Sequence, residues 1–322
     1  MSNVPGLIDP RTPKRLVGCE LVNLAARDPR RLVELSERQY AGRIRAAADQ
    51  ILSTGRHIVM VTGPSAAGKT TSSRKLADEL RRRGVRSEVL SLDDFFVGAG
   101  RYPKLPDGSD DYECVEALDL PVLHKCLQSL AETGECDAPV FDFLTQLPTG
   151  EKRHINCSGG VAIVEGLHAF NPALTAPLPE GAVLNIYASL REEYAGSDGQ
   201  RLIATRDVRL ARRMTRDWKF RGHDADFTMS LWPHVCKSED LYIKAFKKRA
   251  DLVLDTSFSC EAGIWEQYVE QLTASAHTER LATLRRKFAA FDPIDSALIP
   301  PDSMLREFYG GAADRRAQNA DV

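Results

Sequence analysis

The stretch that most constrains the fold is GPSAAGKT at residues 63–70, which matches the pattern G-x-x-x-x-G-K-[ST]. An apolar, β-branched run (57–63) precedes it, and a helical run from Lys69 to Arg83 follows and ends at Gly84. A chance match to this pattern is expected on the order of 0.01 times in a chain of this length. The order strand, glycine-rich loop, helix therefore predicts a phosphate-binding loop.

Each position of the loop has an expected role. Gly63 permits the turn, Gly68 lets the backbone approach a phosphate, and the helix starting near Lys69 adds its positive dipole end. Lys69 would bridge the β- and γ-phosphates, and the Thr70 hydroxyl would bind Mg²⁺. The predicted nucleotide-binding residues are Gly63, Ser65, Ala66, Ala67, Gly68, Lys69, Thr70 and Thr71.

Four further apolar runs, at 86–96, 160–166, 182–189 and 250–257, alternate with helical segments. This alternation predicts an α/β fold with a parallel sheet that is covered by helices on both faces. Residues 137–143 and 152–157 are expected to form a β-hairpin-like excursion. We divide the chain into an extended arm (1–16) with a long helix (28–55), a core (56–275) and a C-terminal helical extension (276–322) whose tail from Gly310 is expected to be disordered.

Two of the predicted strands end in acidic residues. Asp93 and Asp94 follow one strand, and Glu165 closes another, at the sheet edge where α/β proteins bind ligands. An exposed turn or a helix cap is the alternative explanation for the aspartates. After a phosphate-binding loop we favour a proton-accepting role for Asp93 and a Mg²⁺ role for Glu165, because an unpaired carboxylate would be costly to bury in so apolar a strand.

Arginines are concentrated in the helical segment 206–222. At helical spacing Arg209, Arg212, Arg213 and Arg216 share one side, with Arg221 one turn further on. A solvated face is the alternative, but a phosphoryl-transfer site must neutralise several negative charges. We therefore predict an arginine-bearing lid at approximately 203–225.

The composition indicates which classes of partner and which cellular compartment to expect. The net charge of −2 argues against recruitment by nucleic acid or an anionic membrane. The seven cysteines are scattered without a C-x-x-C pair, which is typical of a reducing compartment and not of a disulfide framework or a zinc site. The first residues lack the apolar run of a signal peptide, and no stretch has the length of a membrane span. A cytoplasmic location is expected.

Several motifs together resemble the uridine kinase/phosphoribulokinase superfamily. They occur in the family's order: GPSAAGKTT, SLDDFFV, DGSDDYECVEALDL, VEGLHAFNP, RDVRLARRMTRDWKFRG and LREFYGG. The likeness covers roughly residues 20–310 and is greatest to bacterial uridine-kinase-like nucleoside kinases that often carry an N-terminal threonyl-tRNA-synthetase-like module, which is expected to be absent here. The resemblance implies a P-loop nucleoside-kinase-like fold with a small β-excursion over the acceptor site.

The resemblance also implies an activity and site residues. It implies Mg²⁺-dependent transfer from ATP, or from GTP, to a small-molecule hydroxyl, typically the 5′-OH of a nucleoside such as uridine or cytidine. Carried over by motif, Asp93 is the catalytic base, and Lys69, Arg212, Arg213 and Arg216 stabilise the transferring group. The implied acceptor-binding residues are Tyr112, Glu113, Phe141 and Asp142, and His168 could also contact the acceptor. Relatives are often oligomeric, and the long helix 28–55 could cover its own core or a partner subunit.

Departures from the family pattern leave the acceptor open. Phe141 replaces a tyrosine, Gln146 lies near the position of a base-reading histidine, and Cys236 and Ser238 replace an arginine and a glycine in a later motif. Two alternatives to a nucleoside kinase follow. One is a P-loop kinase acting on a sugar or another small alcohol, and the other is a nucleotide-binding regulatory protein with a degenerate acceptor site.

Overall fold

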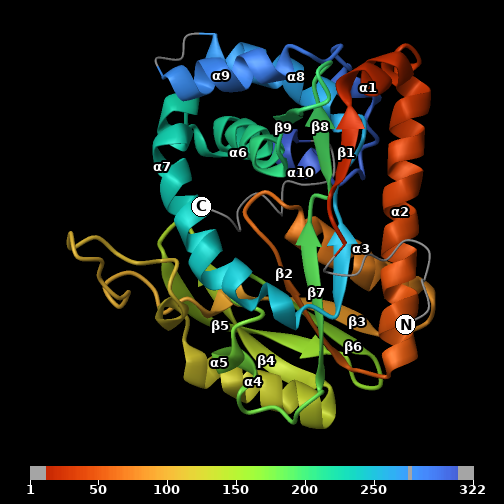
Figure 1. The fold of residues 1–322 in the computed structure, drawn as a ribbon. Helices are drawn as coiled ribbons and strands as arrows, with labels where there is room; N and C mark the ends of the chain where they lie inside the picture. Colours follow the sequence, from red (N-terminus) through yellow and green to blue (C-terminus); the bar gives the residue numbers. More distant parts are fainter. Residues whose placement is uncertain (1–11, 275–277, 311–322) are drawn as a thin grey trace.

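The computed structural model describes residues 12–274 and 278–310. Its centre is a five-stranded sheet in which every neighbouring pair is parallel (Figure 1). The strand order is β10 (Leu252–Asp255), β7 (Val183–Ser189), β2 (Ile58–Thr62), β6 (Val161–Glu165) and β3 (Ser87–Ser91). These are the five predicted strands, so the α/β fold with a helix-flanked parallel sheet is confirmed. The strand predicted at 86–96 is shorter than expected, since residues 92–95 form a 3₁₀ turn.

The two faces of the sheet are covered by different elements. Alternate residues along β2 point to opposite faces, so Val59 and Val61 join one apolar cluster while Ile58 and Met60 join the other. The first cluster lies under α2 (Pro29–Thr54) and α3 (Lys69–Arg82), and the second under α4 (Leu120–Thr133) and α5 (Pro172–Thr175). Because the central strands are apolar on both sides, the sheet is buried between two layers.

The predicted β-excursion is an antiparallel hairpin beside α4. It consists of β4 (Glu135–Asp142) and β5 (Leu147–Asn156), with a register shift between Pro139 and Phe141. The outer strand β5 is exposed over most of its length. In Figure 1 the hairpin lies next to α4 and α5, on the far side of the sheet from α2.

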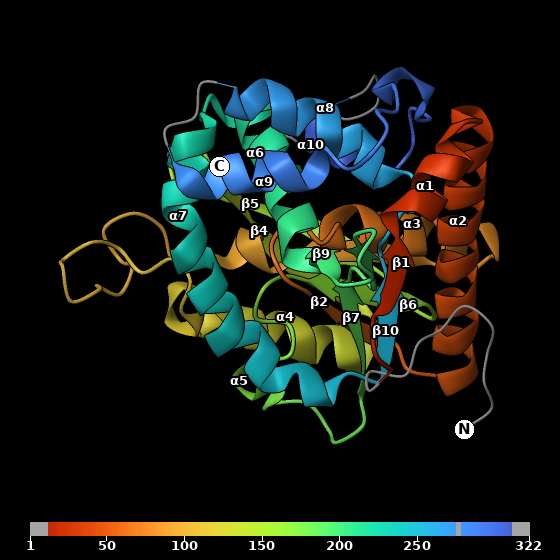
Figure 2. The ribbon, with the colours of Figure 1, turned by 45° about the horizontal axis from the view of Figure 1, so that its top comes forward.

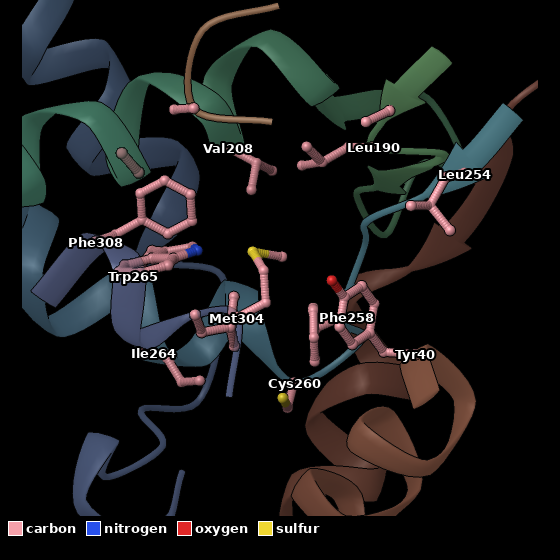
Figure 3. Packing of buried hydrophobic residues seen from close by; sticks show 14 of the residues in the cluster. Tyr40, Leu190, Val208, Leu254, Phe258, Cys260, Ile264, Trp265, Met304 and Phe308 are labelled. Carbon is pink, nitrogen blue, oxygen red and sulfur yellow. The ribbon is translucent and has the colours of Figure 1, made fainter. Parts of the chain in front are cut away.

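The C-terminal half adds a helical layer above the carboxyl ends of the strands (Figures 1 and 2). It comprises α6 (Thr205–Arg221), α7 (Ala225–Ser238), α8 (Glu261–Thr273), α9 (Glu279–Phe288) and the short α10 (Arg306–Tyr309). Their apolar side chains form one continuous cluster with α2 and α3. Figure 3 shows the part of this cluster in which Trp265, Met304 and Phe308 lie together.

A second, small sheet was not predicted. It pairs β1 (Arg15–Gly18) in parallel with β8 (Glu192–Ala195), which pairs with β9 (Arg201–Ile203), and α1 (Cys19–Ala26) follows β1. Arg15 and Leu16, at the end of the arm predicted as extended (1–16), are extended and lie in β1, where Arg15 forms ion pairs with Glu192 (2.9 Å) and the buried Asp255 (2.8 Å). Residues 1–11 and the predicted disordered tail from 311 onward lie outside the described residues.

Candidate active site

The phosphate-binding loop connects β2 to α3, as predicted, and its glycines are required by close contacts. A Cβ atom on Gly63 would collide with the carbonyl oxygen of Ala188 on β7. Gly68 has a φ of +77°, and an added Cβ would lie 2.5 Å from Sδ of Met304. A side chain at Gly63 would displace the backbone, and one at Gly68 would displace the Met304 side chain and adopt a strained φ, so only glycine fits both positions without rearrangement.

A cavity of about 270 Å³ lies directly in front of this loop, at the carboxyl ends of the strands. Many of the residues singled out from the sequence meet there. The predicted residues that line it are Ser65, Ala66, Ala67, Gly68, Lys69, Thr70, Asp93, Tyr112, Glu113, Glu165, His168, Arg213 and Arg216. Gly63 and Thr71 do not line it; Gly63 lies at the start of the loop, and the Thr71 hydroxyl donates to Glu307 Oε2 (2.6 Å) on α10.

The metal-binding prediction concerns Thr70 and Glu165, which lie together. Glu165 is the last residue of β6 and is buried, with 4% of its surface exposed. The Thr70 hydroxyl donates to Glu165 Oε1 (3.1 Å), and the hydroxyl of Ser91, its neighbour on β3, lies 3.4 Å from the same oxygen. Hydroxyl and carboxylate oxygens are ligands that Mg²⁺ accepts, often through water, so these residues fit a Mg²⁺ site.

The two adjacent aspartates after β3 lie within the 3₁₀ turn Leu92–Phe95, and their side chains have different surroundings. Asp93 lines the cavity. Asp94 faces the hairpin instead, where its carboxylate is 3.9 Å from Arg153, and burial raises its pKa above the ordinary value. Only Asp93 is therefore placed to meet a ligand in the cavity.

Arg213 and Arg216 project from α6 into the cavity, together with Arg221. Arg213 Nη1 donates to the hydroxyl of Ser65 in the loop (2.9 Å). The carboxylate of Asp217, which is 1% exposed, faces both Arg213 (3.3 Å) and Arg221 (3.0 Å). One buried carboxylate thus orients guanidinium groups toward the place where phosphates would lie.

The prediction that Arg212 belongs to this group is not supported by its position. Arg212 is fully buried, and its Nε and Nη2 donate to both oxygens of Glu261 (2.7 and 2.9 Å). Its remaining contacts are the carbonyl oxygens of Thr256 (2.9 Å) and Ala66 (3.3 Å). Because α6 is packed on several sides, this arginine supports the loop from behind and does not face the cavity.

The lining that does not come from the loop or from α6 has a different composition. It includes Tyr112 and Glu113 together with apolar and aromatic side chains: Phe96, Leu118, Phe143, Leu167 and Val235. Burial raises the pKa of Glu113, and the nearby Arg213 opposes this shift. This side therefore offers hydrogen-bonding groups within an otherwise apolar surface.

His168 is the most unusual group on that wall. It is 4% exposed, and neither ring nitrogen makes a hydrogen bond of ordinary geometry, although the carbonyls of Glu113 and Cys114 lie nearby. Burial lowers its pKa to about 4, so the ring is neutral near pH 7. A neutral imidazole carries one donor and one acceptor, and the His168 ring lines the cavity.

Two predicted acceptor residues do not reach the cavity. Phe141 packs between Phe96 (5.8 Å between ring centroids) and Phe143 (5.1 Å), and Phe143 is the ring that lines the wall. Asp142 points the other way and accepts from the backbone of Leu144 (3.0 Å) and the hydroxyl of Thr145 (2.8 Å). Phe141 therefore contacts the cavity wall through the neighbouring aromatic rings, and Asp142, the next residue along the strand, caps the hairpin turn.

Sequence reasoning missed two carboxylates at the cavity, Glu239 and Glu307. Glu239 follows Ser238 in the later motif that also contains Cys236, and Glu307 lies in LREFYGG, but neither motif reveals a contact with Ser65, 174 positions away, or with Thr71, 236 positions away. Glu307 on α10 meets Thr71 in the first turn of α3. The motifs were therefore the sign in the sequence that these two glutamates matter, whereas the residues that they contact depend on the fold.

Comparison with known proteins identifies the family of this chain. A family model described as "Phosphoribulokinase / Uridine kinase family" matches residues 58–187 and 201–260, which together exceed half of the chain. The chain belongs to this family. Membership in a family of P-loop kinases implies in general the use of a nucleotide and Mg²⁺ and a small-molecule substrate.

Individual relatives are distant. A uridine kinase of Deinococcus deserti is 24% identical over 222 residues, which cover 69% of this chain and 95% of the relative. A uridine kinase of Saccharomyces cerevisiae is 26% identical over 204 residues, 62% of this chain, and the match spans only 37% of the length of that relative.

Two solved structures are also similar. A possible uridine kinase from Bacillus stearothermophilus is 21% identical, with a TM-score of 0.46, over 66% of this chain and 98% of that one. A phosphoribulokinase from Rhodobacter spheroides is 17% identical, with a TM-score of 0.42, over 64% of this chain and 74% of that one.

Within the part of this chain that the structure describes, no helix is both long and apolar enough to cross a bilayer.

Proposed function

We propose that this chain transfers the γ-phosphoryl group of ATP to a hydroxyl of an uncharged small molecule, with the 5′-OH of a pyrimidine nucleoside as the first candidate. The observation that carries the proposal is the meeting of Asp93, Lys69 and Glu165 in one cavity. A carboxylate, a phosphate-binding lysine and a Mg²⁺ site side by side are the components that phosphoryl transfer to an alcohol requires.

In the proposed reaction Asp93 accepts the proton of the acceptor hydroxyl as its oxygen bonds to the γ-phosphorus. The bond from the γ-phosphorus to the β–γ bridging oxygen breaks, and ADP leaves with that oxygen. Thr70 and Glu165 would hold Mg²⁺, which when bound neutralises charge on the β- and γ-phosphates. Lys69, Arg213 and Arg216 stabilise the charge that spreads over the transferring group.

The acceptor wall supports an uncharged acceptor. The cavity-facing cations lie in the loop and on α6, whereas the opposite wall carries Glu113, the neutral His168 and aromatic rings. A phosphorylated sugar or a hydroxy acid would bring a second anion close to Glu113, whose carboxylate already faces Arg213 and Lys69. A nucleoside fits better, because it combines ribose hydroxyls with a flat apolar ring.

The altered motif residues keep one alternative in view. Phe141, Gln146 and Cys236 stand where relatives have polar acceptor-reading groups, so a sugar or another small alcohol is the second candidate. A purely regulatory nucleotide-binding protein is less favoured, since such a protein has no need for a carboxylate at the position of Asp93. We further propose the cytoplasm as its location, in keeping with seven cysteines that are all free thiols.

A coupled ADP-release assay with Mg²⁺-ATP tests the proposal across nucleosides, ribose-type sugars and small hydroxy acids. We expect turnover with a nucleoside and a loss of about 10²–10⁴-fold in kcat for Asp93→Asn, with nucleotide binding retained. Asp94→Asn is the matched control, because the neighbouring carboxylate faces Arg153. Full activity of Asp93→Asn would remove Asp93 as the base. If only sugars are phosphorylated, a sugar replaces the nucleoside as the proposed acceptor. If no compound of the panel is phosphorylated, the alternative of a regulatory nucleotide-binding protein is favoured.

A further inference from the structure

The segment that follows α7 is a π-helical turn, Glu239–Ile243. Such wide turns are rare and occur frequently at functional sites. Its first residue, Glu239, is 1% exposed and forms part of the cavity wall, yet the family comparison and the predicted catalytic set leave it without a role.

Glu239 holds the front of the phosphate-binding loop. Its Oε1 accepts from the backbone N–H of Ser65 (2.9 Å), and Arg209 Nη1 donates to the carbonyl oxygen of the same residue (2.9 Å). Arg209 in turn donates to both carboxylate oxygens of Glu239 (2.5 and 2.9 Å). The three residues form a closed ring of hydrogen bonds that fixes both backbone polar groups of Ser65.

This ring of hydrogen bonds is largely buried, and the side chain of Trp232 packs against it. Arg209 is 4% exposed, and its guanidinium lies over the ring of Trp232 (5.6 Å to the centroid). A bidentate arginine–carboxylate pair has a defined geometry, so a carboxylate held in this way transmits that geometry to the amide it binds. The next loop residue, Ala66, has a φ of +56°, which a non-glycine residue adopts only when its surroundings enforce it.

The same turn also reaches the acceptor wall. Tyr242, three residues after Glu239, makes an edge-to-face contact with His168 (5.3 Å between ring centroids). A single irregular turn therefore contacts the phosphate-binding loop through Glu239 and the cavity-lining His168 through Tyr242.

We propose that Glu239, oriented by Arg209, is a positioning residue for phosphoryl transfer, which aligns the Ser65 end of the loop with the acceptor wall. This inference rests on the proposed kinase function. It predicts that loss of the carboxylate misaligns donor and acceptor, so that water competes better with the acceptor for the phosphoryl group. Misplacement of reacting groups by about 1 Å can reduce the rate of transfer about 10²-fold.

The test compares Glu239→Ala and Glu239→Gln with Asp240→Asn. Asp240 is the next residue of the same turn, and its half-exposed carboxylate pairs with Arg206 and Lys244 without contacting the loop. Each variant is measured for transfer, for hydrolysis of Mg²⁺-ATP without acceptor, and for calorimetric binding of the β,γ-imido analogue of ATP with Mg²⁺. The stoichiometry of binding reports the folded fraction separately from the affinity.

For Glu239→Ala we expect a ratio of hydrolysis to transfer that rises about tenfold, a kcat for transfer that falls about 10²-fold and an affinity for the analogue that weakens about tenfold, at a stoichiometry near that of the wild type. Glu239→Gln keeps an acceptor for the Ser65 amide and should fall between, and Asp240→Asn should stay within about twofold. An unchanged ratio and affinity, or a fall in stoichiometry alone, would overturn the positioning role. If the wild type transfers to no acceptor, the proposed function fails, and the affinity for the analogue still decides the role of Glu239.

Discussion

The acid sensitivity of this protein should depend measurably on one buried histidine. His168 has a pKa of about 4 in the folded state, against an ordinary value of 6.5, because burial disfavours its charged form. Below pH 6.5 the unfolded chain binds a proton at this residue that the folded chain rejects. Stability therefore falls as the pH falls from 6.5 toward 4, and this contribution is nearly absent above pH 7.

The size of the effect follows from the shift in pKa. A pKa that falls from 6.5 in the unfolded state to about 4 in the folded state lowers the free energy of unfolding by about 3 kcal/mol at pH 4. At pH 5 the unfolded chain is almost fully protonated at this site and the folded chain is almost fully neutral, which gives about 2 kcal/mol. The glutamine of His168→Gln does not titrate. Between pH 7.5 and pH 5, the free energy of unfolding of this variant should therefore fall by about 2 kcal/mol less than that of the wild type.

Urea unfolding at these two pH values measures the difference, and other titrating groups cancel when the two proteins are compared. His154→Gln is the control. His154 is exposed, and its hydrogen bond to Asp137 raises its pKa, so it contributes stability that is present at low pH and lost as the pH rises through its folded pKa. Its removal should not reduce the acid sensitivity. If the free energy of unfolding changes with pH by the same amount in the wild type and in His168→Gln, a neutral, buried His168 is refuted.

Four further outcomes can be checked on single variants. Arg212→Ala should lower the free energy of unfolding in urea by about 3–5 kcal/mol, because it leaves Glu261 buried without its partner. Arg213→Ala should lower kcat about 10²-fold and lower that free energy less than Arg212→Ala does, since the buried Asp217 keeps Arg221 as a partner. Gly68→Ala should abolish calorimetric binding of the nucleotide, because the residue needs a positive φ. If Glu113 binds acceptor hydroxyls as a carboxylate, the acceptor KM should rise as the pH falls through a range above the usual glutamate pKa, whereas Glu113→Gln should show a flat KM.

The sheet and the phosphate-binding loop were predictable because their signals are local. A strand buried on both faces is a short apolar run, and the loop needs glycine where the backbone meets Ala188 and Met304. The acids at the strand ends were found for the same reason, since the carboxyl ends of parallel strands meet at one edge.

The small sheet and the π-helical turn were not predictable in this way. β1 is four residues long and becomes a strand only because β8, some 177 positions away, presents an edge and Glu192 to Arg15. The turn at Glu239 likewise depends on a loop 174 positions earlier. Neither segment carries a hydrophobic period of its own, so the sequence offers no local sign of the partner.

The arginine helix shows where pattern reasoning reaches its limit. Helical spacing placed Arg209, Arg212, Arg213 and Arg216 on one side, yet the four divide into a pair that faces the cavity and a pair that supports the loop from buried positions. The spacing is the same for both pairs, and what separates them is the presence of carboxylates at 239 and 261, which lie on other helices. A cluster of arginines after a phosphate-binding loop therefore predicts that phosphate chemistry is nearby, but which guanidinium meets the phosphate is decided by the acids that hold the others away from it.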